Sequence, residues 1–471
     1  MAFWNRRKSV DAAAHLAEEH RLKPTLGWPH LVALGVGAIV GTGIYTLTGI
    51  GAGLAGPAVI LSFALAGVVC ACAALAYAEL ATMMPVAGSA YTYSYAVIGE
   101  LIAWIVGWSL ILEYTVVCAA VAVGWSAYAA GVIHSLHLGI SDALLSGPQA
   151  GGAFNFPAVL ISLAVAGLLA FGTRESATVN FLLVVIKLVA LAAFVLLALP
   201  AFDGGHFTPF APNGIYKLTP DGLKLGIVPA ASLIFFAFYG FDTISTAAEE
   251  TKNPGRDLSI GIVGSMILCT LIYMIVAAAA IGAAPVDSLA KSAEPLAYIL
   301  RELQHPLAAN LIGAAAIVAL PSVIMAFLYG QSRIFFVMAR DGLLPRALSR
   351  VSPRTGTPVL MTVLTGIWAA IISGLAPLKA IAELANAGTL CAFVAVAVCM
   401  MVLRLREPAR QRVFRAPLWW LVGPLAVAGC LYLFANLPAK TQILFFAWNA
   451  AGLLVYFLYS VRASRLAATY V

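Results

Sequence analysis

Three ionisable residues lie in the middle of long apolar stretches: Lys187 in FLLVVIKLVALAAF, Glu113 in LILEYTVV and Asp242 in FYGFDTIST. Lys187 lies eleven residues from Ser176 and thirteen from Pro200. In a helix this separation is roughly 16 to 20 Å, too far for a lysine side chain to reach either end. Charged groups at membrane depth are costly and are functional by default. We therefore interpret the three residues as candidate proton-coupling groups.

Other roles are open to each of them. Lys187 could instead hold helices together by hydrogen bonds to backbone carbonyls. Glu113 and Asp242 could carry a proton, neutralise Lys187 or bind a cationic substrate side chain. Asp242 could also cap the free N–H groups of a helix that begins beside it. A further set of carboxylates at helix ends is expected to form salt bridges with loop arginines: Glu79, Glu249 and Glu250.

The backbone offers a second kind of chemistry in two glycine-containing stretches. Residues 35–57, GVGAIVGTGIYTLTGIGAGLAGP, hold eight glycines in an apolar setting, although glycine costs a helix about 1 kcal/mol relative to alanine. Residues 232–250, SLIFFAFYGFDTISTAAEE, place Gly240 in the middle of another apolar span. Small residues four apart, such as Gly37 and Gly41, also serve plain helix packing. Two interrupted helices, five helices apart, point instead to an inverted-repeat transporter.

Interrupted helices can bind a zwitterion through their backbone. Free N–H groups at the start of a half-helix attract a carboxylate, and free carbonyls at the end of one attract an ammonium group. Irregular backbone at membrane depth is tolerated where it is buried in protein or lines a watery cavity. The two stretches therefore predict a binding site for an amino acid.

The composition identifies the chain as an integral membrane protein. Of its 471 residues, 62% are hydrophobic and 10% are charged, whereas soluble proteins carry about 25% charged residues; the mean hydropathy is +0.96. No cleavable signal peptide is apparent in the first thirty residues, and no segment is long enough for a separate soluble domain. A span of about 20 residues per crossing predicts twelve transmembrane helices. Their expected cores are 31–53, 57–82, 101–130, 156–172, 176–200, 227–248, 260–282, 308–338, 357–375, 380–404, 417–435 and 441–461.

The distribution of basic residues predicts the orientation. With the N-terminus in the cytoplasm, 20 of the 27 lysines and arginines fall in inward segments and six in outward loops. This asymmetry predicts that both termini are cytoplasmic. It also explains the net charge of +7 without a nucleic-acid partner, because a cytoplasmic face beside anionic lipid is ordinarily basic.

Several function classes lack their sequence signatures. The seven cysteines lie in apolar segments without metal-ligand spacing, and no H-E-x-x-H or G-x-S-x-G motif occurs. We therefore expect neither an enzyme nor a bound cofactor or metal. A channel would need a repeated filter or pore ring, which the sequence does not show.

Long motifs carry a family resemblance. GVGAIVGTGIYTLTG, AYAELATMMPVAGSAYTYSYAVIGELIAWIVGW, FYGFDTISTAAEETKNPGRDLSIGI, LYGQSRIFFVMARDGLLP and IAELANAGTLCAFVAV resemble the amino acid–polyamine–organocation superfamily. More narrowly, they resemble the bacterial members of its cationic amino acid transporter branch. The resemblance spans roughly residues 27–415. It implies a cytoplasmic arm (1–30), a leucine-transporter-like five-plus-five inverted-repeat core (31–404) with broken first and sixth helices, and two appended helices (405–471).

The resemblance also implies a function and a site. The function is uptake of amino acids across the bacterial cytoplasmic membrane, coupled to protons or in exchange for one another. The backbone at Thr42 and Gly43 would receive the substrate carboxylate, and the Ile39 carbonyl would face its amine. In relatives, a lysine at the position of Lys187 contacts the backbone of the first and eighth helices and replaces a sodium ion. The remaining site residues are the carbonyls of Phe236, Ala237 and Tyr239, for the ammonium group, and the side chains of Phe236, Phe238 and Ile244, as pocket or gate residues or else as packing residues.

The expected lining bears on substrate choice. The branch suggests cationic substrates, but Phe236, Phe238 and Ile244 are apolar, and a guanidinium buried there without a partner would cost several kcal/mol. We therefore expect small or medium neutral amino acids to be preferred. Exchange in place of symport, a cationic amino acid or polyamine substrate, the oligomeric state and an accessory subunit remain open.

Overall fold

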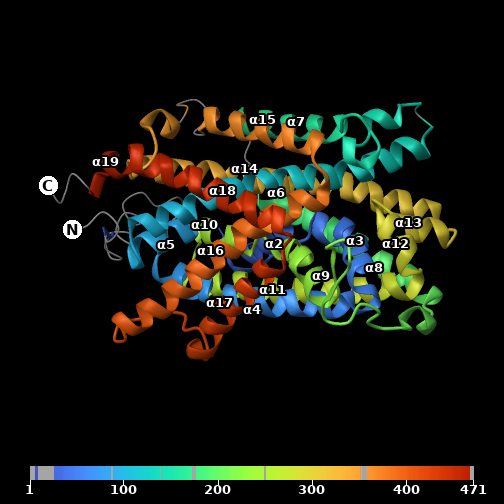
Figure 1. The fold of residues 1–471 in the computed structure, drawn as a ribbon, viewed down its shortest axis with the longest axis horizontal. Coiled ribbons are helices and arrows are strands. Elements are labelled where there is room, and N and C mark those ends of the chain that lie inside the picture. Colours follow the sequence, from blue (N-terminus) through green and yellow to red (C-terminus); the bar gives the residue numbers. More distant parts are fainter. Residues whose placement is uncertain are drawn as a thin grey trace.

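The computed structural model describes residues 6–8, 26–85, 88–137, 139–171, 177–248, 251–350, 352 and 358–466. Four of the inward charges counted above, Arg21, Lys23, Arg174 and Arg354, lie outside these residues, as do the ion pairs expected of Glu249 and Glu250. The expected all-α class is confirmed: most helices run along the long axis of the molecule, and a two-stranded hairpin is the one sheet of the described part (Figure 1).

Fourteen helical pieces make up the bundle, and four shorter helices lie at its ends. The bundle pieces are α2 (Trp28–Ile39), α3 (Thr48–Ala55), α4 (Val59–Met83), α6 (Glu100–Ser135), α7 (Phe156–Ala170), α8 (Ala177–Ala198), α9 (Ile227–Ile234), α10 (Phe241–Thr246), α11 (Pro254–Ala283), α14 (Pro306–Arg340), α15 (Val359–Leu375), α16 (Leu378–Arg406), α17 (Trp419–Asn436) and α18 (Ala439–Val455). The shorter helices are α5 (Ser89–Val97), α12 (Val286–Lys291), α13 (Pro295–Glu302) and α19 (Val461–Ala463), and the hairpin consists of β1 (Lys217–Leu218) and β2 (Lys224–Leu225).

Nine helical segments of the described part are long and apolar enough to cross a membrane. The first of them, Trp28–Met83, is 56 residues long, and two further apolar helices, α7 and α15, are shorter than a full span. Large apolar side chains are exposed along the helices that border the bundle, including Leu168, Leu182, Leu271 and Leu364. An apolar exterior of this kind is typical of a surface in contact with lipid.

Helices α6 and α11 each pack against several other helices of the bundle. Helix α6 packs against α14, α15 and α16, while α11 packs against α2 and α4. Helix α18 is fastened to α6 by a pair of indoles: Trp108 Nε1 donates to the carbonyl of Trp448 and Trp448 Nε1 to that of Trp108, both at 2.9 Å. Their rings stack with centroids 5.0 Å apart.

Ion pairs gather at the end of the bundle where the two described ends of the chain meet. Arg6 donates to the carbonyl of Val461 and lies 3.5 Å from the carboxylate of Glu100. Nearby, Lys8 pairs with Asp341, which follows α14. The N-terminal and C-terminal portions of the described chain therefore lie on the same side.

The salt bridge expected of Glu79 is confirmed. Its carboxylate is buried and accepts from Arg404 at 2.7 Å and from Arg412, in the loop after α16, at 3.1 Å. The backbone N–H of Ala416 donates to the same group. These bonds join the end of α4 to the end of α16.

The helical backbone changes course at two places in the interior. Helix α2 ends at Ile39, Val40 is extended (φ −73°, ψ 93°), and a π-helical turn, η2 (Gly43–Leu47), leads into α3. Helix α9 tightens into a 3-10 turn, η8 (Phe235–Phe238), before α10 begins. Between η8 and α10, Gly240 has φ +110°, a conformation that favours glycine.

Candidate functional site

The two irregular segments contact each other through their glycines. A Cβ atom added at Gly43 would overlap the Cα and Cβ atoms of Ala237 in η8. A Cβ at Gly240 would lie 2.6 Å from the Cβ of Ala38 and 2.9 Å from the amide nitrogen of Ile39. Each glycine thus admits the backbone of the opposite segment, so glycine serves close approach here as well as helix interruption.

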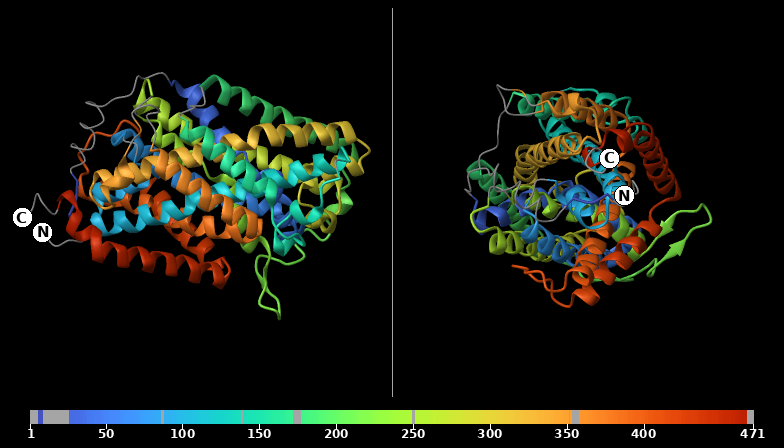
Figure 2. Two further views of the ribbon diagram at one scale, coloured as in Figure 1. Left: turned by 90° about the horizontal axis from the view of Figure 1, so that it is seen from above. Right: turned by 90° about the vertical axis from the view of Figure 1, so that its left-hand side faces the viewer.

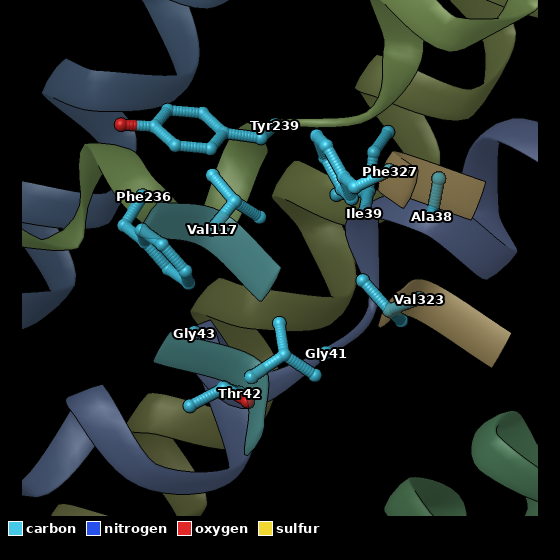
Figure 3. A pocket seen from close by; sticks show the side chains of 11 residues that line it. Ala38, Ile39, Gly41, Thr42, Gly43, Val117, Phe236, Tyr239, Val323 and Phe327 are labelled. Carbon is cyan, nitrogen blue, oxygen red and sulfur yellow. The ribbon is translucent and has the colours of Figure 1, made fainter. Parts of the chain in front are cut away.

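A narrow cavity lies where these segments meet α6 and α14 (Figure 3), and its empty space is about 230 Å³ when the open solvent at its mouth is included. Figure 3 shows the side chains of Val117, Val323, Phe236 and Phe327 around it, with Thr42 at one end and Tyr239 at the other. None of the lining residues carries a charge. They are Ala38, Ile39, Gly41, Thr42, Gly43, Val117, Val121, Phe236, Tyr239, Val323 and Phe327.

Polar groups of the cavity come from the start of the segment that follows α2. The hydroxyl of Thr42 is buried, and no hydrogen-bond partner is found for it among the described residues. The amides of Thr42 and Gly43 lie in the first turn after the extended Val40, where helical N–H groups have no partner within their own helix. Together these donors can hold an anionic group.

The Ile39 carbonyl, expected to face a substrate amine, already has one partner. The hydroxyl of Tyr273 in α11 donates to it at 2.7 Å. A carbonyl oxygen has two lone pairs, so a second donor can still be accepted. Tyr273 therefore orients this carbonyl without excluding a ligand.

Asn386 organises the other irregular segment and did not figure among the sequence predictions. Its Nδ2 atom donates to the carbonyls of Ser232 and Leu233, at 2.6 and 3.0 Å, in the last turn of α9. Its Oδ1 atom accepts from the hydroxyl of Tyr239, a cavity residue. A fully buried amide of α16 thus satisfies groups on both sides of η8. The one signal in the sequence was an asparagine within the apolar run IAELANAGTL.

The structure brings most of the predicted substrate residues together. The cavity described above is lined by Ile39, Thr42, Gly43, Phe236 and Tyr239. Ala237 lies behind it, against Gly43. Their binding roles stay predictions.

Two predicted pocket residues lie outside this cavity. The Phe238 ring packs against Phe63 and Tyr273, with centroids 6.3 and 5.4 Å away. The Ile244 side chain lies against Gly35, where an added Cβ would come within 2.6 Å of it. In this conformation both residues pack between helices, and a gating role for them stays a prediction.

Lys187 lies fully buried in α8 and contacts two other helices. Its Nζ atom donates to the carbonyl of Gly37 in α2 at 2.7 Å and to the hydroxyl of Ser322 in α14 at 3.3 Å. The sequence predicted carbonyl partners on both helices. On α14 the hydroxyl of Ser322, the residue after Pro321, accepts from the ammonium group. The ammonium group therefore links α2 to α14 through α8.

The two buried carboxylates have different surroundings. Asp242 accepts from the hydroxyl of Tyr114 at 3.0 Å and from the amide of Gly240 at 3.2 Å, so it holds the turn before α10 as the capping alternative anticipated. Glu113 lies against Gly388, and its Oε2 atom has no partner among the described residues. Neither residue lines the cavity.

Comparison with known proteins gives consistent matches over nearly the whole chain. Residues 26–459 match the family model described as amino acid permease. The chain is 41% identical over 466 residues to the branched-chain amino acid permease BcaP of Bacillus subtilis (strain 168), and 37% identical over 464 residues to the methylthioribose transporter of the same strain, with 98% of each chain covered. It is also 38% identical over 409 residues to the vacuolar cationic amino acid transporter 4 of Arabidopsis thaliana, covering 86% of this chain and 67% of the relative.

Proposed function

This chain belongs to the amino acid permease family, as its motifs predicted, and from that premise we propose that it imports neutral amino acids by proton-coupled alternating access. The observation that carries the choice of substrate is the uncharged lining of the cavity. Apolar side chains of α6, α14 and η8 surround the space that a substrate side chain would occupy.

The lining favours an aliphatic substrate over a cationic one. A buried cation needs a paired carboxylate, and burial of the cation without that carboxylate costs several kcal/mol. The sequence puts two carboxylates deep in apolar segments, those of Glu113 and Asp242, and neither residue lines the cavity. The relative named as a branched-chain amino acid permease agrees with this choice, whereas the cationic transporters of Arabidopsis argue for the alternative.

We assign substrate recognition mainly to the backbone. The carboxylate would accept from the amides of Thr42 and Gly43 and from the Thr42 hydroxyl, which has no partner among the described residues. The ammonium group would donate to the carbonyl of Ile39 and to carbonyls of η8 and Tyr239. This arrangement places the zwitterion between the two irregular segments and directs the side chain toward Val117, Val323 and Phe327.

The helices fit a twelve-crossing inverted repeat. Twelve crossings result when Trp28–Met83 is counted as two spans that meet near Gly56, and when α7 and α15 are counted as spans. In this scheme α2–η2–α3 and α9–η8–α10 are the paired broken helices, and rocking of α2, α4, α9–α10 and α11 opens the site to each side in turn. The distribution of basic residues supports a cytoplasmic location for both chain ends.

Lys187 is the proposed coupling residue. When protonated, its ammonium group links α2 to α14 through Gly37 and Ser322 and holds the closed arrangement. When the proton leaves, the lysine is neutral and both bonds weaken, which frees α2 to move with its bundle. Proton binding and substrate closure are then linked through one side chain.

Reconstituted uptake tests this function. Proteoliposomes with an acidic exterior should accumulate labelled leucine and alanine, and the uptake should saturate and be competed by neutral amino acids. Uptake that requires amino acid inside the proteoliposomes and does not depend on the pH gradient would indicate the exchange alternative. Arginine competing better than alanine and leucine would refute the neutral preference.

Orientation has its own test. Cysteines introduced at positions 215, 290 and 378 should react with an impermeant reagent from outside the cell, and those at 255, 350 and 410 should not. The reversed pattern would overturn the topology.

A further inference from the structure

The segment between α8 and α9 forms a hairpin with a defined turn. Lys217 pairs with Leu225 and Leu218 with Lys224. The turn closes through Gly222, which has φ +78° and donates to Thr219, while the amide of Leu223 donates to the Thr219 hydroxyl at 3.0 Å. The direction in which each strand side chain points is therefore fixed.

The hairpin lies across one end of α17. Lys224 Nζ donates to the carbonyls of Ala435 and Leu437, both at 3.0 Å, which are among the groups left free at a helix end. From this end the chain returns along α18 to Val461, which contacts Arg6. The hairpin is thus at the end of α17 and the beginning of α18, on the side away from the described chain ends.

Figure 2 shows the hairpin projecting sideways, beyond the outline of the bundle and across the direction of the helices. Two-stranded hairpins are marginally stable in water when isolated, and this one exposes large apolar side chains. Tyr216 is 46% exposed and Leu218 58%.

The strand register places Tyr216 and Leu218 on the face from which Lys224 reaches the end of α17. Leu218 is directly opposite Lys224, so their side chains share a face, and Tyr216, two residues earlier, shares it too. Lys224 reaches from this face to the end of α17. Lys217 lies on the opposite face, because successive side chains of a strand alternate. Ile215 and Leu223 share that face and are 66% and 46% exposed, so the bonds of Lys224 to the end of α17, rather than a difference in apolarity, distinguish the two faces.

We propose that the hairpin rests on the bilayer surface, with Tyr216 and Leu218 in the interfacial region of the leaflet on that side and Lys217 in water. On α17 and α18, next to the end that Lys224 contacts, Leu431, Tyr432 and Ile443 are also exposed. Tyrosine is enriched at membrane interfaces, and lysine stems extend to place their charge in the polar layer. We therefore assign phospholipid as the partner of this face, because a hairpin that projects sideways at this level contacts the lipid around the protein.

Spin labels on neighbouring residues test the depth of each face. Leu218→Cys and Lys217→Cys would be labelled with a nitroxide in proteoliposomes, in a background where the two half-buried cysteines are removed by Cys72→Ala and Cys391→Ala. Collision with oxygen reports lipid, and collision with a water-soluble nickel chelate reports water. Leu431→Cys on α17 and Asp287→Cys in α12 serve as lipid and water references.

The proposal expects the ratio of oxygen to nickel accessibility at position 218 to approach that at 431, and the ratio at 217 to approach that at 287. Equal nickel accessibility at 217 and 218 would overturn it. Spin–spin broadening at 218 that disappears on dilution with unlabelled protein would also overturn it, because the face would then contact a second copy of the chain. Saturable uptake by each labelled variant shows that it is folded.

Discussion

Gly41→Ala tests the role of the cavity without disturbing the packing around it. A Cβ atom at Gly41 would lie 3.5 Å from a methyl group of Val323 and 3.9 Å from the carbonyl oxygen of Ile39, which are ordinary contacts. Gly41 lines the cavity, so the added methyl group occupies substrate space without displacing protein atoms. We therefore expect a folded transporter with a smaller pocket.

The size of the effect follows from the value of one methylene in an apolar pocket, about 1–3 kcal/mol, or roughly 10- to 200-fold. Leucine and isoleucine should lose at least about tenfold in competition against labelled alanine, while alanine itself changes much less. The assay is the concentration of each unlabelled amino acid that halves alanine uptake. An unchanged ratio of leucine to alanine would refute the assignment of this cavity to the substrate side chain.

Gly43→Ala is the matched control. The same methyl group at Gly43 would overlap backbone and side-chain atoms of Ala237, so η2 and η8 must move apart. Transport of all substrates should then fall together, without a change in selectivity. A selective loss at Gly43 instead would show that Gly43, rather than Gly41, borders the side-chain space.

Three further outcomes are expected. Lys187→Met should retain binding but lose uptake driven by a pH gradient, and gradient dependence like that of the wild type would contradict its coupling role. Asn386→Ala removes a donor from the carbonyls of Ser232 and Leu233 and the acceptor of the Tyr239 hydroxyl, at about 1–3 kcal/mol for a buried group left unpaired, and should lower the temperature of thermal unfolding and weaken binding. An unchanged melting curve would mean that these groups find other partners. Thr42→Val should weaken binding about tenfold, the value of a hydrogen bond to a charged group, whereas Thr42→Ser should not, and equal effects would exclude the hydroxyl as a ligand.

The glycine interruptions show what can be predicted from local composition and what cannot. Gly43 and Gly240 stand out against apolar surroundings, so the stretches around them could be singled out from the sequence. Their partners could not, because the contacts of Gly43 with Ala237 and of Gly240 with Ala38 join segments that lie about two hundred residues apart. The same holds for Asn386, whose role depends on α16 passing beside η8.

The sequence by itself determined the membrane class, the helical segments and the depth of Lys187, because each depends on composition along a continuous stretch. Tertiary structure alone decided that Phe236 faces the cavity while Phe238 and Ile244 do not, and that Ser322 is a partner of Lys187 on α14. The physical reason is that helices in the centre of this bundle are apolar all round. A helix without a polar face carries no signal for which side is turned inward, so the facing of its side chains is set by packing against its neighbours.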